Sequence, residues 1–135
     1  MKERIKDKIK GIEKYLQELE ELIPDSFEDY LDDFVIRAAC ERYFEKIVES
    51  AVDLAFLLIR FNEFPSPESD VGAFEILAKN NTISFELSEK LKDAKSMRNI
   101  IAHEYGEVDD KLVFPSIKNE LIKDIIDFLK EIKWK

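Results

Sequence analysis

The longest stretch without a helix breaker runs from Phe27 to about Asn62, and it constrains the fold more than any other feature. It contains neither proline nor glycine, and its apolar residues recur every three or four positions in two neighbouring stripes. One stripe consists of Ile36, Cys40, Tyr43, Ile47, Ala51, Leu54, Leu58 and Phe61, and the other of Phe44, Val48, Ala55 and Ile59. We predict one long central helix, because this apolar face is too wide for a single neighbour. Such a helix would span roughly 50 Å, so part of it, particularly from Ile47 to Phe61, is expected to pack against a second subunit.

The remaining segments also have helical periodicity. An amphipathic helix of about 20 residues from Ile5 to Ile23 is expected to end at 24–26, where Ser26 can cap the next helix. After a proline-containing loop, Asp70 can cap a short helix that ends at Asn80-Asn81.

Two more helices complete the predicted fold. Ser84 can cap a fourth helix, which Gly106 is expected to end, and Pro115 suits the first turn of a fifth helix. With only 3 Gly and 4 Pro, the chain has too few turn residues for an all-β protein. We predict one all-α domain over residues 1–135, an up-down bundle of four main helices and one short helix.

Composition excludes several classes of protein. The single cysteine, Cys40, rules out a disulfide framework, and the single histidine, His103, rules out a multi-histidine zinc site within one chain. We therefore predict neither a metal site nor a cofactor. No apolar run reaches the length of about 18 residues that a membrane helix needs, and the N-terminus has no signal-peptide pattern. We expect a soluble, cytoplasmic protein.

The charge of the chain is negative but unevenly distributed. A net charge of −9 argues against broad, non-specific binding of nucleic acids. Residues 18–33 carry eight acids and no base, whereas residues 90–98 carry Lys90, Lys92, Lys95 and Arg98 against Asp93 alone. This second run could form a local basic patch, or simply a solvated helix face.

The predicted fourth helix ends in the sequence RNIIAHEY, residues 98–105. Asn99 and His103 are four residues apart and share a helix face, so the amide could orient the imidazole. Arg98 and Tyr105 also share a face, but Arg98 and His103 are about 140° apart on a straight helix. A simpler interpretation stays open: His103 interacts with the helix dipole, Arg98 forms a surface ion pair with Glu104 or Glu107, and Tyr105 packs.

The segment matches the R-x4-H-x-Y motif of HEPN domains, and the whole chain resembles the HepT-like toxins of MNT/HEPN toxin–antitoxin modules. The resemblance implies a helical bundle that dimerises with both motifs facing one cleft and cleaves RNA without a metal. It also implies that Arg98 and His103 are the catalytic pair and that Asn99 supports them. Tyr105 matches the tyrosine that a partner nucleotidyltransferase antitoxin modifies with AMP.

Elementary chemistry is consistent with these roles. Metal-free cleavage of RNA needs a base for the 2′-hydroxyl, an acid for the leaving 5′-oxygen, and positive charge beside the phosphorus. Histidine can serve as acid or base, and the planar cation of arginine matches a phosphate. Because this chain has one histidine, both roles could be filled in a dimer that brings two copies of His103 and Arg98 together.

Two other functions remain possible from the sequence. The chain could be a non-catalytic nucleotide-binding or dimerisation partner of a nucleotidyltransferase, which its acidic charge slightly favours. It could also be a purely structural dimerisation domain in which the motif is only a helix end.

Overall fold

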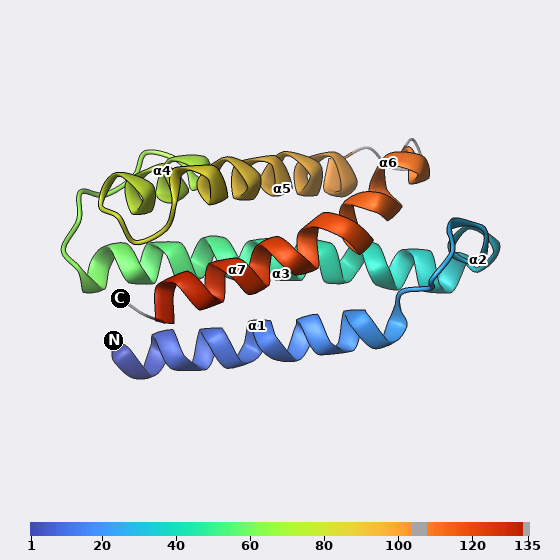
Figure 1. Ribbon diagram of the computed structural model, residues 1–135, viewed down its shortest axis with the longest axis horizontal. Coiled ribbons are helices and arrows are strands. Elements are labelled where there is room, and N and C mark those ends of the chain that lie inside the picture. Colours follow the sequence, from blue (N-terminus) through green and yellow to red (C-terminus); the bar gives the residue numbers. More distant parts are fainter. Residues whose placement is uncertain (104–107, 134–135) are drawn as a thin grey trace.

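The computed structural model describes residues 1–103 and 108–133, and every regular element in this part of the chain is a helix (Figure 1). The elements are α1 (Lys2–Leu22), α2 (Phe27–Asp32), α3 (Phe34–Phe61), α4 (Asp70–Lys79), α5 (Phe85–His103), α6 (Asp110–Pro115), the π-helix η1 (Ser116–Leu121) and α7 (Ile122–Lys133). The long helices run side by side along the molecule, with α3 between α1 and α5. The all-α prediction is confirmed.

The predicted uninterrupted helix from Phe27 to Asn62 is wrong in one respect, because it is broken at Asp33. This residue has an extended backbone (φ −122°, ψ 99°). Its carboxylate accepts hydrogen bonds from the N–H groups of Val35 and Ile36, at 3.0 and 3.1 Å. Asp33 therefore caps α3 and separates it from the short helix α2, which Ser26 caps as predicted, by accepting from the N–H of Asp29. Before α5 the chain thus has two short helices, α2 and α4, instead of one.

The apolar faces of α3 are covered by the same chain. Ile47, Ala51 and Leu54 are almost completely buried, because α1, α4, α5 and η1 all pack on this helix. At the end of the predicted stripe only Phe61 is exposed, at 43%. The central position of the helix is confirmed. Most of the stripe from Ile47 to Phe61 is buried within the chain and is not available to a second subunit. The argument for a dimer that was based on this apolar stripe is therefore wrong.

The caps around α4 and α5 follow ordinary local chemistry. Ser69, not Asp70, caps α4, because its hydroxyl accepts a hydrogen bond from the N–H of Gly72 at 3.0 Å. Beyond the helix, Asn81 adopts the left-handed conformation expected there, with φ 61°. Ser84 caps α5 as predicted, accepting from the N–H of Leu87 at 3.0 Å.

The last helical segment begins earlier than predicted. Asp109 caps α6 through the N–H of Lys111, at 3.0 Å, and Pro115 lies at the end of α6 rather than in a first turn. Proline lacks an N–H group, and its ring crowds the carbonyl four residues before it, so it disturbs the regular helical hydrogen bonds. The wider turns of η1 follow directly, before α7 resumes as an α-helix. Gly106, the predicted helix terminator, lies outside the described residues.

Candidate functional site

Three residues of the motif, Arg98, Asn99 and His103, lie on the last two turns of α5. The inner face of this helix is fixed in the core by Leu87, Leu91 and Ile101. The helix continues through His103, so it does not end early enough to bring Arg98 and His103 to the same side. In Figure 1 this end of α5 points towards the end of the bundle where α6 and α2 lie.

Arg98 is mostly buried, and it forms an ion pair with a residue that the sequence did not indicate. Its side chain is 18% exposed, and its Nη2 atom donates to the carboxylate of Glu49 on α3. Its Nη1 atom lies 3.4 Å from the Oδ1 atom of Asn99, and its Nε atom is buried without a hydrogen-bond partner among the described residues. One feature of the sequence could have pointed to Glu49. It follows Val48, an apolar residue of the second stripe, on a helix predicted to be central.

His103 and Asn99 are both exposed, and Asn99 does not orient the imidazole in the structure. Its amide oxygen faces Arg98 instead, and within the described part of the chain no hydrogen bond links Asn99 to His103. His103 is the last residue of α5. One chain therefore places the two predicted catalytic residues about 140° apart around the axis of one helix, and His103 is exposed to solvent.

Tyr105 lies outside the described residues. The same holds for Glu104 and Glu107, the alternative ion-pair partners considered for Arg98. The role predicted for Tyr105 therefore rests on the sequence alone.

The basic run at 90–98 is a set of ion pairs rather than a free basic patch. Lys90 lies 3.5 Å from Glu86, Lys92 lies 2.9 Å from Glu75, and Lys95 lies 3.2 Å from Asp70. Hydrogen bonds to Glu75 and Glu89 are the largest reasons that the pKa of Lys92 is raised. Two of these pairs tie α5 to α4, so the lysines contribute to helix packing and leave little free positive charge for nucleic acid.

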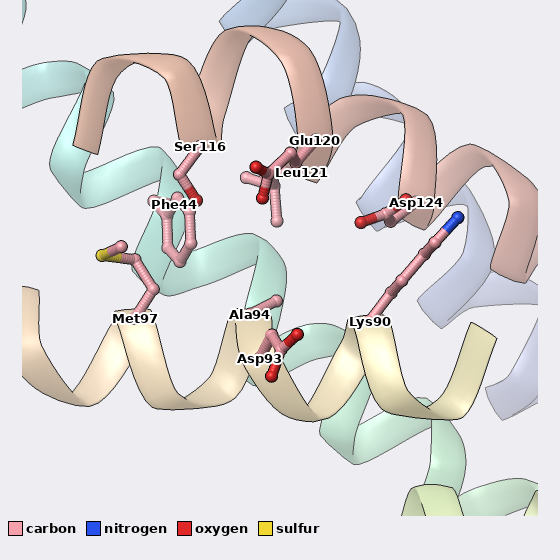
Figure 2. Close-up of a pocket in the computed structure, with 9 residues that line it drawn as sticks. All are labelled: Phe44, Lys90, Asp93, Ala94, Met97, Ser116, Glu120, Leu121 and Asp124. Carbon is pink, nitrogen blue, oxygen red and sulfur yellow. The ribbon is translucent and has the colours of Figure 1, made fainter. Parts of the chain in front are cut away.

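A cavity of about 130 Å³ lies between α5 and the segment formed by η1 and α7 (Figure 2). Phe44 and Met97 contribute apolar walls, and Lys90 points towards Asp124, a carboxylate whose pKa is raised mainly by burial. Neither Arg98 nor His103 lines this cavity. Chemistry that involves these two residues would therefore not take place in this cavity.

Two named relatives match most of this chain. An "mRNA nuclease HepT" from Shewanella oneidensis is 27% identical over 133 residues, which is 98% of each chain. A "tRNA nuclease HepT" from Aphanizomenon flos-aquae is 26% identical over 113 residues, covering 84% of this chain and 77% of that protein.

Solved structures agree with these relatives. The tri-AMPylated HEPN toxin of Shewanella oneidensis, in complex with an MNT antitoxin, superposes with a TM-score of 0.89 at 26% identity and 97% coverage of both chains. A toxin–antitoxin structure with AMP-PNP gives a TM-score of 0.89 at 25% identity, covering 97% of this chain and 98% of that chain. Residues 12–132 match the family model described as "HepT-like: Ribonuclease HepT-like". The chain therefore belongs to the HepT-like ribonuclease family.

Proposed function

We propose that this protein is the ribonuclease toxin of a toxin–antitoxin module, with a nucleotidyltransferase of the MNT type as its antitoxin. The observation that carries the proposal is the complete sequence RNIIAHEY, whose first six residues are the last six of α5, in a chain that belongs to a ribonuclease family. Two relatives are named as nucleases of mRNA and tRNA, and a matching structure is a toxin bound to an MNT antitoxin. In the described residues no helix is long and apolar enough to cross a membrane. The proposal places the protein in the cytoplasm, with its RNA substrate.

The proposed reaction is attack by the RNA 2′-hydroxyl on the adjacent phosphorus. An imidazole of His103 takes the hydroxyl proton, and a protonated imidazole gives a proton to the leaving 5′-oxygen. The guanidinium of Arg98 stabilises the negative charge that develops on the phosphorane oxygens. The P–O5′ bond breaks as the new O2′–P bond forms, which leaves a 2′,3′-cyclic phosphate and a 5′-hydroxyl.

A cleavage assay tests this function. The purified chain, without its antitoxin, should cleave single-stranded RNA in the presence of EDTA and leave 2′,3′-cyclic phosphate ends. An RNA with 2′-O-methyl groups should remain intact, because its nucleophile is blocked. Binding of both RNAs without cleavage of either would support the alternative, a non-catalytic partner of a nucleotidyltransferase.

The site proposed here is completed by a second subunit. One chain supplies a single imidazole, and Arg98 and His103 are about 140° apart around the axis of α5. Two of the exposed apolar side chains are Phe34 at the start of α3, which is 73% exposed, and Leu112 on α6, which is 62% exposed. These two segments lie at the same end of the bundle as the C-terminal end of α5 (Figure 1). A homodimer that covers part of this surface would bring two motifs together.

Mixing subunits tests the shared site. If each cleavage event needs His103 from both subunits, a heterodimer of wild type and His103→Ala is inactive. At a roughly ninefold excess of the variant, random exchange should lower the activity per wild-type chain about tenfold. The measurement is RNA cleavage after equilibration of the mixed subunits, with light scattering to confirm the dimer. Constant activity per wild-type chain would contradict a shared site, and so would a mass of one chain.

Regulation is proposed to act on Tyr105. Transfer of AMP to its hydroxyl would place a bulky anion near Arg98 and the substrate phosphate. Tyr105→Phe should keep RNA cleavage within about twofold, because the phenol takes no part in 2′-hydroxyl attack. After co-expression with the antitoxin and ATP, intact-mass measurement should show added AMP on the wild type only. Equal AMP addition to both proteins would remove Tyr105 from this role.

A further inference from the structure

Glu49 is the acidic residue that meets the motif from another helix. It lies in the middle of α3, and its carboxylate receives the Nη2 hydrogen bond of Arg98. The backbone around it is anchored, because Val48, Ala51 and Val52 are buried in the core. Because the helix backbone is anchored, the carboxylate of Glu49 can restrict the position of the long, flexible side chain of Arg98.

The guanidinium of Arg98 has few other restraints. The contact with Asn99 is long, at 3.4 Å, and the Nε atom is buried without a partner among residues 1–103 and 108–133. Glu49 therefore fixes the Nη2 side of the guanidinium through this hydrogen bond. Nη1, the other terminal nitrogen, faces Asn99, which is an exposed residue.

We propose that Glu49 is a positioning residue that orients Arg98 for the phosphate of the substrate. This inference rests on the proposed ribonuclease function, since it assigns Arg98 a phosphate to contact. An arginine that is already held in its working geometry loses less conformational freedom when the substrate reacts.

A purely structural role is the competing explanation. The side chain of Glu49 is 44% exposed, and an ion pair in such a position contributes little to stability. The negative charge of Glu49 also repels the substrate phosphate. Glu49 therefore cannot help by attracting the substrate, but it can help by orienting Arg98. The two acids one turn away pair elsewhere: Glu45 lies 3.6 Å from Arg42, and Asp53 lies 3.5 Å from Lys8.

The kinetic test compares variants of Glu49 with a matched control. Glu49→Ala should lower kcat for RNA cleavage by about 10- to 100-fold with little change in KM, because Arg98 is displaced in the transition state. Glu49→Gln keeps an oxygen acceptor and should lose less. Asp53→Asn removes an ion pair from the same helix without touching Arg98, and it should leave kcat and KM unchanged.

A double variant shows whether Glu49 acts through Arg98. Adding Glu49→Ala to Arg98→Lys should lower kcat by a smaller factor than it does in the wild type. Lysine lacks the planar guanidinium that Glu49 is proposed to orient. Equal losses in both backgrounds would overturn the proposal. Faster cleavage or tighter RNA binding by Glu49→Ala would also overturn it, since Glu49 would then compete with the substrate.

A measurement without catalysis separates this inference from the proposed function. In ¹⁵N NMR spectra, the guanidinium N–H groups of Arg98 should show restricted rotation in the wild type and free rotation in Glu49→Ala. If the wild type does not cleave RNA, the proposed function fails, while these spectra still decide whether Glu49 orients Arg98. Free rotation in the wild type would overturn the positioning role whatever the activity.

Discussion

His103→Ala should lower the rate of RNA cleavage by about 10² to 10⁴, the usual loss when a positioned acid–base group is removed. His103 is the only histidine of the chain, so no second imidazole in the same subunit can replace it. The side chain is exposed at the end of α5, and its removal creates no cavity in the core. Single-turnover cleavage of RNA, with thermal unfolding alongside, measures both effects; the unfolding midpoint should stay close to that of the wild type.

Two controls make this result specific. Lys10→Ala changes an exposed residue of α1 and should leave the cleavage rate unchanged. Added imidazole should restore part of the activity of His103→Ala, because the vacated position is open to solvent. Unchanged cleavage by His103→Ala would contradict the acid–base mechanism, even if the protein proved to be a nuclease.

The helices could be predicted from sequence where local chemistry determines them. Ser84 caps α5 and Asn81 takes the left-handed conformation, because each depends on a few neighbouring residues. The break at Asp33 could not be foreseen in the same way. No proline or glycine marks it, and a carboxylate there can either continue a helix or cap the next one.

The width of an apolar face predicts how many neighbours a helix has, but not which chain supplies them. The two stripes of α3 correctly indicated a central helix. Its neighbours are α1, α4, α5 and η1 of the same subunit, which leaves Ile47 and Leu54 fully buried without a dimer. In the described part of the chain, the most exposed large apolar side chains all lie outside the predicted part of the stripe; they are Phe34, Phe85, Val35 and Leu112.

The residue types of the candidate site could be predicted from the motif, but their contacts could not. Arg98 and Glu49 are 49 positions apart, and their pairing depends on how α5 packs against α3. Periodicity within one helix contains no information on that register. For the same reason Asn99, assigned to His103 by its spacing, faces Arg98 in the structure.

Arg98→Ala should lower the cleavage rate by about 10² to 10³, the loss typical of removing one group that stabilises transition-state charge. Folding should be little affected, because the partner left behind, Glu49, is 44% exposed and can be solvated. Measurement of the single-turnover rate and the unfolding midpoint checks both parts.

Arg98→Lys separates the charge of this residue from its geometry. A lysine keeps the positive charge but cannot hold Glu49 and a phosphate with one rigid, planar group. We therefore expect a rate between those of Arg98→Ala and the wild type, with a normal dependence of RNA binding on salt. A rate equal to that of the wild type would show that charge alone is sufficient. A rate as low as that of Arg98→Ala would show that the planar fork, held by Glu49 on one edge, is what the reaction requires.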